Sequence, residues 1–303
     1  MEKGTLQKRI RGLLKEKNAI LLVHYYQRGE VQEIADLLGD SFALSVEAAK
    51  TGADIIVFAG VHFMAESACI LSPQKTVLLP RPEAGCPLAD MITPGELAAF
   101  KKENPGVQVV SYVNSSAAVK AQSDICCTSS NVVKVINSLE GDRVLMVPDG
   151  NLARYAAGFT RKEVIPWKGY CPVHHLVTAV EVRAVKAKHP QAVFACHPEC
   201  NQEVTALADY VGSTAGIIQF AKETKASEII VGSEQGIFFP LKKASPEKTF
   251  IPASDKMICE TMKLTTLDDI YRVLDRMENV VTVPEDVRVP ASLALRRMLE
   301  ASE

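Results

Sequence analysis

The segment EAGCPLAD at residues 83–90 has two further versions in this chain, KGYCPVHH at residues 168–175 and KMICETMK at residues 256–263. Each version holds one cysteine, and Cys86, Cys171 and Cys259 are separated by 85 and 88 residues. A period of this length indicates three copies of one supersecondary unit rather than a solenoid of short repeats. If the units surround an axis, one thiol from each reaches a common point, and three thiolates there indicate a metal centre.

Polar side chains at other positions repeat over the same total distance. The equivalent sets are His24, Tyr112 and His197; Tyr26, Asn114 and Glu199; Asp36, Asp124 and Asp209; and Ser41, Ser129 and Thr214. These sets extend the repeat well beyond the cysteines. They also place polar groups at matching points of all three units.

Each unit contains three short apolar runs that we predict to be strands buried on both faces. The runs are residues 19–23, 55–59 and 76–79; 107–111, 144–147 and 163–165; and 193–195, 229–231 and 249–251. Helical stretches separate the runs, and this alternation predicts a parallel sheet in each unit. The predicted fold class is therefore α/β, with three repeated units of parallel sheet between helices around a pseudo-threefold axis.

We place the three units at residues 1–104, 105–190 and 191–303, the last with a C-terminal tail. Capping boxes at Thr93 and Thr178, each with a glutamate three residues later, predict a helix after each of the first two cysteines. Thr266 begins a weaker third version. The tail after Val283 is predicted to be extended and then to form a short terminal helix.

The composition excludes several classes of protein. The chain has 303 residues, 47% of them hydrophobic, and a formal net charge of −2. The absence of a basic tract argues against nucleic acid and anionic membranes as partners. The first stretch, MEKGTLQKRIRGLLKEKN, predicts a charged amphipathic helix, and no run reaches the ~20 apolar residues of a membrane span. We therefore predict a cytoplasmic protein, in which eight cysteines are too few for a disulfide scaffold.

The repeated cysteines leave two kinds of metal centre open. A single free cysteine is most often a small buried hydrophobic residue, and this interpretation suits Cys69, Cys126 and Cys127. Packing alone does not require a thiol at one point of three diverged units. Zinc takes four ligands in a structural site, of which one could be a histidine. An iron–sulfur cluster held by only three cysteines leaves one iron open to act as a Lewis acid.

The loops after the first strand of each unit carry polar side chains where α/β proteins bind ligands. They read HYYQ at 24–27, YVNS at 112–115 and HPEC at 197–200. Glu199 lies two residues from His197, so both side chains can face one side of an extended segment and exchange protons.

Serines precede a helical stretch in each unit. The candidate N-caps are Ser41, Ser129 and either Ser213 or Thr214. Helix capping alone would explain these residues without a ligand. Converging helix N-termini also bind anions, so a ligand with several negative groups could be held there. Carboxylates follow the second strand at Asp149 and Glu234, where the first unit has Val61, and we expect pocket walls or contacts between units at these positions.

These motifs together resemble those of the quinolinate synthase family of bacterial and archaeal NAD biosynthesis. The matching segments, in order, are HYYQ, GDS, FMAE, CP, YVNS, CTSSN, PDGNL, CPVH, HPEC, VGST and CETMK, between residues 24 and 263. Departures are small, with Ala153 where glycine is frequent in the family and Ser233 where threonine is common. The chain also lacks the C-terminal cysteine triplet of some members, which leaves Cys259 as the third ligand.

The resemblance implies a [4Fe–4S] cluster at the junction of the three units, bound by Cys86, Cys171 and Cys259. It implies condensation of iminoaspartate with dihydroxyacetone phosphate to quinolinate, with release of phosphate and two waters. L-aspartate oxidase or aspartate dehydrogenase is the expected, transient supplier of the imine. Substrate binding is expected from His24, Ser41, Tyr112, Asn114, Ser129, His174, His197, Glu199, Ser213 and Thr214. The expected catalytic residues are Tyr26, His24, His197 and Glu199, with Glu199 the first choice for general base.

Three other functions fit the residues without the resemblance. An aconitase-like hydro-lyase would use the same open iron on another hydroxy acid and would form no pyridine ring. An iron–sulfur redox or oxygen sensor would need a partner-binding or DNA-binding surface, and the chain has no basic helix for the latter. A zinc protein of the same fold would differ in its metal content.

Overall fold

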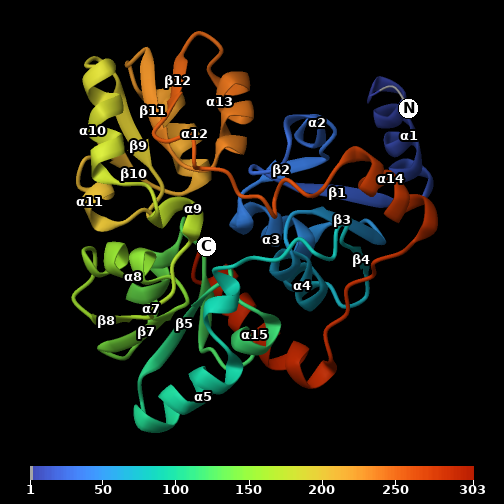
Figure 1. Cartoon of the computed structure of the whole chain (residues 1–303). Helices are drawn as coiled ribbons and strands as arrows, with labels where there is room; N and C mark the ends of the chain where they lie inside the picture. Colours follow the sequence, from blue (N-terminus) through green and yellow to red (C-terminus); the bar gives the residue numbers. More distant parts are fainter. Residues whose placement is uncertain (1–2) are drawn as a thin grey trace.

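The computed structural model describes residues 3–303 and contains three parallel sheets of four strands each, arranged as three lobes around a common centre (Figure 1). The first sheet has β1 (Ala19–His24), β2 (Leu37–Gly39), β3 (Ile55–Ala59) and β4 (Thr76–Leu78). The second has β5 (Gln108–Tyr112), β6 (Ile125–Cys127), β7 (Arg143–Val147) and β8 (Glu163–Pro166). The third has β9 (Val193–Cys196), β10 (Tyr210–Val211), β11 (Glu228–Gly232) and β12 (Thr249–Pro252). The predicted α/β class with three repeated units is confirmed.

The three sheets share one strand order, in which the first strand of each unit lies between the second and the third. The prediction of three strands per unit was wrong, because β2, β6 and β10 form the fourth strand at one edge of each sheet. These strands are two or three residues long. Such short edge strands carry too few residues for an apolar run to stand out from the loop that follows.

Helices cover the sheets on both faces. Those before the second cysteine are α1 (Lys3–Glu16), α2 (Gly29–Gln32), α3 (Ser41–Lys50), α4 (His62–Leu71), η1 (Ala89–Met91), α5 (Pro94–Glu103), α6 (Ala117–Lys120), α7 (Val132–Ser138) and α8 (Gly150–Ala157). The others are α9 (Pro172–His175), α10 (Ala179–Lys188), α11 (Gln202–Thr205), α12 (Thr214–Glu223), η2 (Gln235–Ile237), α13 (Phe238–Ala244), α14 (Leu267–Arg276) and α15 (Glu285–Glu300). None of the described helices is long and apolar enough to cross a membrane. Met1 and Glu2, in the predicted N-terminal helix, lie outside the described residues.

The helix that follows each cysteine packs on the sheet of the next unit. Leu97 of α5 shares a core with Val109 of β5, and Val182 of α10 shares one with Phe194 of β9. Ile270 of α14 packs with Leu21 of β1, so the third helix returns to the first unit and closes a ring. All three helices begin with the predicted capping box, including the weaker one at Thr266. The boundaries between units remain a prediction.

The C-terminal tail differs from the prediction of an extended segment and a short helix. α15 begins directly after Pro284 and runs for 16 residues, with Pro290 inside it. Its buried residues, among them Leu295 and Met298, belong to the core shared by the first two units. At its end Ser302 accepts a hydrogen bond from Asn131 Nδ2, which places the C-terminus beside the loop after β6.

Candidate metal and substrate site

The carboxyl ends of the parallel strands converge on one central cavity, as expected for ligand sites in α/β proteins. The cavity is lined by His24, Tyr26, Ser41, Cys86, Tyr112, Asn114, Ser129, Cys171, His174, His197, Glu199, Thr214 and Cys259. These are the residues expected from the sequence apart from Ser213. Ser213 lines a separate surface groove that also includes Ser129. Residues far apart in the chain thus meet in one site.

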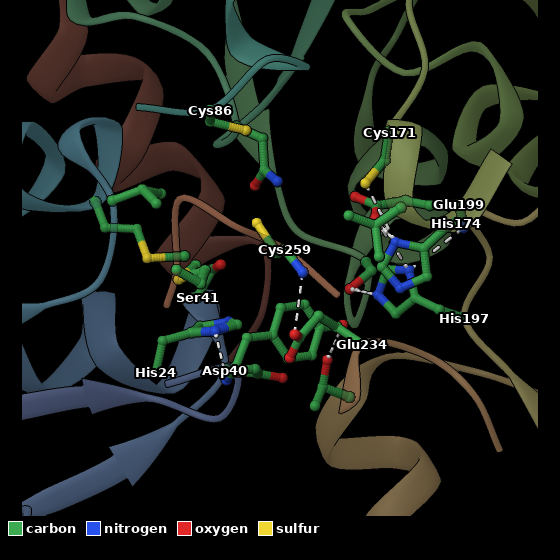
Figure 2. Close-up of a pocket in the computed structure, with 18 of the residues that line it drawn as sticks. His24, Asp40, Ser41, Cys86, Cys171, His174, His197, Glu199, Glu234 and Cys259 are labelled. Carbon is green, nitrogen blue, oxygen red and sulfur yellow. Dashed lines mark hydrogen bonds and ion pairs between the residues drawn. The ribbon is translucent and has the colours of Figure 1, made fainter. Parts of the chain in front are cut away.

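The three cysteines lie in equivalent local structures and face the same space (Figure 2). Each begins a helical turn, because its carbonyl accepts the N–H of the residue four positions later: Asp90, His175 or Lys263. Burial raises the pKa of all three thiols, to about 12 for Cys86, against the opposing effect of nearby backbone N–H groups. A bound cation favours the thiolate form, so metal binding would offset this rise in pKa.

The residues present fit a cluster held by three thiolates, and all eight cysteines of the chain are free. A second donor set lies at one side of the same cavity. Cys171, His174 and Glu199 offer ligand atoms that all lie within 4.8 Å of one another. Zinc binds such a mixed set, and three protein ligands are typical of its catalytic sites. The geometry therefore shows that Cys171, His174 and Glu199 could hold a metal ion together.

The histidine loops of the first and third units share one hydrogen-bonding pattern. His24 Nδ1 accepts the N–H of Tyr26 at 3.1 Å, and His197 Nδ1 accepts the N–H of Glu199 at 3.3 Å. Burial lowers the pKa of both imidazoles to about 3, so both are neutral near pH 7. A neutral ring that accepts at Nδ1 carries its proton on Nε2. His197 Nε2 accordingly donates to Ser129 Oγ at 3.2 Å.

Glu199 is buried beside two imidazoles and the Tyr112 hydroxyl. Its carboxylate lies 2.8 Å from His174 Nδ1 and 3.4 Å from His197 Nδ1. Burial by itself raises the pKa of Glu199, but His197, His174 and the Tyr112 hydroxyl together lower it to about 2. The carboxylate is therefore ionised near pH 7.

Tyr26 occupies the equivalent position in the first unit but has different partners. Its hydroxyl lies 2.9 Å from both Thr214 Oγ1 and Ser233 Oγ in the third unit. Burial is the main reason that its pKa lies well above 10, so the hydroxyl keeps its proton. It can donate to a ligand or exchange a proton through the two hydroxyls it contacts.

The second unit supplies Tyr112 and Asn114 to the cavity. Both lie at the end of β5 where the other units have a histidine and its partner. Asn114 Oδ1 is buried and has no hydrogen-bond partner among the described residues. A buried acceptor without a partner is costly, and a ligand N–H would satisfy it.

Two of the serines expected to cap helices do not do so. Asp40 is the N-cap of α3 and accepts the N–H of Ala43, which leaves Ser41 as the first helical residue. Asn131 precedes α7, so Ser129 lies outside the helix and faces His197. Ser213 is the true N-cap of α12, where it accepts the N–H of Gly216. The Asp40 carboxylate takes the capping role at α3, whereas Asn131 at the start of α7 makes no capping hydrogen bond with its side chain.

Ser233 and Lys263, near the cavity, were not assigned a role from the sequence, and Asp149 and Glu234 were expected to be pocket walls or contacts between units. Ser233 Oγ contacts Tyr26 and lies 3.4 Å from His174 Nε2. Glu234 lines the cavity and forms an ion pair with Lys263, whereas the equivalent Asp149 does not line it. The expectation of a pocket wall therefore holds for one of the two carboxylates. The recurrence of Glu234 and Asp149 after equivalent strands was the available signal.

A three-lobed α/β protein with three thiols, an ionised carboxylate and neutral imidazoles in one central cavity has the residues of an enzyme site that could hold a metal ion. The family model for the quinolinate synthetase A protein matches residues 8–300, and the chain belongs to that family. It is 55% identical over 299 residues to a quinolinate synthase of Geobacter sp. strain M21, covering 99% of this chain and 98% of that protein. It is 53% identical, with the same coverage, to quinolinate synthase 1 of Methanosarcina acetivorans.

Proposed function

We propose that this protein condenses iminoaspartate with dihydroxyacetone phosphate to quinolinate, releasing phosphate and two waters. The observation that carries the proposal is the convergence of one cysteine from each unit on the cavity that also holds Glu199 and the two buried histidines. Membership of the quinolinate synthetase A family supports the same reaction. The substrates carry two carboxylates and one phosphate, which suits a cavity lined by hydroxyl and imidazole donors.

Cys86, Cys171 and Cys259 would hold a [4Fe–4S] cluster. With three protein ligands, the cluster would supply a Lewis acid at its open iron for loss of a substrate hydroxyl. The cysteine turns support this assignment, because they present three equivalent thiols from three directions. This arrangement leaves one side of the site free for substrate.

The neutral imidazoles and hydroxyls are suited to holding the substrate anions. His24 Nε2–H can donate to a carboxylate or phosphate oxygen, and so can the hydroxyls of Ser41, Ser129 and Thr214. Asn114 Oδ1 lacks a donor, which suits an imine or amine N–H of the substrate. Neutral donors of this kind bind anions without the permanent charge that would hold the product too tightly.

Glu199 is the group best placed to take a proton from the condensing carbon. It is ionised and buried, and His174 Nδ1–H, 2.8 Å from the carboxylate, donates to it and fixes its position. Tyr26, with Thr214 and Ser233, forms a second group of hydroxyls that can move a proton, and Ser233 Oγ lies 3.4 Å from His174 Nε2.

We expect the protein to work in the cytoplasm, where thiols stay reduced and an L-aspartate oxidase or aspartate dehydrogenase would provide the unstable imine. The formal net charge of −2 gives no electrostatic reason for a nucleic acid or a membrane as partner.

The deciding experiment is anaerobic purification, iron and sulfide analysis, and an assay for quinolinate from the two substrates. The proposal predicts four irons and four sulfides per chain and quinolinate as product. A full cluster without quinolinate would favour a hydro-lyase or a sensor. Zinc in place of iron would instead favour the Cys171, His174 and Glu199 set.

A further inference from the structure

Two buried carboxylates hold the loops of two of the repeated cysteines, and only one of them also reaches another unit. Asp149 Oδ2 accepts the N–H of Cys171 at 3.1 Å, and Glu234 Oε1 accepts the N–H of Cys259 at 3.1 Å. Both side chains are fully buried. The first unit has Val61 at the equivalent position, so Cys86 has no such support.

Glu234 differs from Asp149 because it has a cationic partner. Lys263 Nζ lies 2.9 Å from Glu234 Oε1, and the same ammonium donates to the carbonyl oxygen of Tyr26 in the first unit. Asp149 has no ion-pair partner among residues 3–303. Its second oxygen caps α8 by accepting the N–H of Leu152.

The backbone of Lys263 is also held, at its N–H and at its carbonyl oxygen. Its N–H donates to the carbonyl of Cys259, and its own carbonyl accepts from Arg28 Nε at 2.7 Å. Gln27 Nε2 contacts Met262 Sδ at 3.4 Å. The Cys259 turn of the third unit therefore lies directly against residues 26–28 of the first.

From this geometry we propose that Glu234 and Lys263 are positioning residues that couple the Cys259 loop to the loop of His24 and Tyr26. Movement of Cys259 changes the position of Glu234 and Lys263, and through the Tyr26 carbonyl it changes the position of the Tyr26 hydroxyl. The inference rests on the proposed function, because the coupling would hold the cluster ligand Cys259 and the proton-transfer group Tyr26 at a fixed distance from each other. Neither residue needs to contact substrate for this role.

The test is amide hydrogen exchange on the full chain, purified anaerobically and also after removal of iron. In Lys263→Met, the Tyr26 and Gln27 amides should exchange about tenfold faster than in the wild type, because a charge-assisted bond is lost. Lys263→Arg keeps the charge and should restore most of the protection. Lys256→Met is the matched control, since Lys256 is in the same segment and pairs with Glu181 at 2.9 Å without reaching the first unit.

Iron content and kinetics separate positioning from general damage. Lys263→Met should retain the wild-type iron content while kcat falls about tenfold, the loss expected when one charge-assisted contact is removed. Because this variant leaves Glu234 buried without its partner, the Glu234→Gln/Lys263→Met double variant provides a second test and should show the same faster exchange. The double variant should also lose protection at the Cys259 amide.

Unchanged exchange at Tyr26 and Gln27 in both variants would overturn the coupling, as would an equal effect of Lys256→Met. The exchange measurement after iron removal requires neither a cluster nor turnover. If the wild type bound no iron or formed no quinolinate, the proposed function would fail while this measurement still decided the coupling.

Discussion

The loops after β1 and β9 use the same backbone device for different chemistry. In both, histidine Nδ1 accepts the N–H of the residue two positions later, which leaves Nε2–H to face the cavity. The residue two positions later is Tyr26 in the first unit and Glu199 in the third. Tyr26 lies between two hydroxyls, and Glu199 lies among imidazoles.

The difference shows which part of the repeat is structural and which is chemical. The backbone N–H two positions after the histidine fixes the tautomer of its ring, whether that residue is a tyrosine or a glutamate. The residue two positions later determines whether the loop offers a protonated hydroxyl or an ionised carboxylate. Burial raises the pKa of Tyr26, whereas the groups around Glu199 lower the pKa of its carboxyl to about 2. A repeated scaffold can therefore place an acid and a base at matching points of one site.

The largest effect should come from removing the base. Glu199→Gln keeps the size and several hydrogen bonds of the side chain but cannot accept the proton, and we expect kcat to fall about 1000-fold. Iron content and the visible spectrum should stay those of the wild type. Turnover within tenfold of the wild type would remove Glu199 from the mechanism and make the two loops chemically equal.

A smaller loss is expected on the other side of the comparison. Tyr26→Phe removes the hydroxyl that contacts Thr214 and Ser233 but leaves the backbone pattern of the His24 loop intact. We expect kcat to fall about 100-fold, at the lower end of acid–base contributions. The control is Tyr25→Phe on the neighbouring residue, which does not line the cavity. Equal losses in Tyr26→Phe and Glu199→Gln would show that the acid and the base contribute alike.

The acid sensitivity of the fold tests whether the two imidazoles are equivalent. The pKa of His24 and His197 falls from 6.5 to about 3 on burial, so the unfolded chain binds more protons below pH 6.5. Stability from these groups is complete above pH 6.5 and is lost as the pH falls towards 3. Between pH 7 and pH 5, each imidazole should contribute about 2 kcal/mol to the loss of unfolding free energy.

Urea unfolding of the iron-free protein at the two pH values measures this difference. His24→Gln and His197→Gln should each reduce the loss of unfolding free energy between pH 7 and pH 5 by a similar amount. A change in only one variant would show that the other ring is already protonated in the folded protein. For His197, the neighbouring Glu199 is the group that would cause this.

Much of this architecture could be predicted from the sequence because it depends on periodic apolar runs and on residue types at fixed spacing. The nine predicted strands, the three capping boxes and the cavity position of the cysteines follow from these signals. Strands β2, β6 and β10 were missed because their two or three residues carry no period and run directly into a loop. The contacts of Lys263 were missed because they depend on how the third unit docks on the first, which local spacing does not encode.

Helix capping offers the smallest and most direct test of how the ring closes. The three capping boxes look alike in sequence, but Glu96 is exposed whereas Asp269 is buried. Asp269 also pairs with Arg272 at 3.0 Å and with Arg81 of the first unit at 3.5 Å. Asp269→Asn should therefore lower the free energy of unfolding by about 1–2 kcal/mol, because it weakens a cap and a contact across the ring.

The matched variant Glu96→Gln alters an exposed cap and an exposed ion pair with Lys168 at 3.5 Å, and its effect on urea unfolding should be clearly smaller. Equal effects would mean that the contact with Arg81 adds nothing and that α14 is held by its apolar face alone. A larger effect of Asp269→Asn would show that the third unit is fastened to the first by polar contacts at this helix. Such fastening is needed there because α14 returns from the end of the third unit to the sheet with which the chain began.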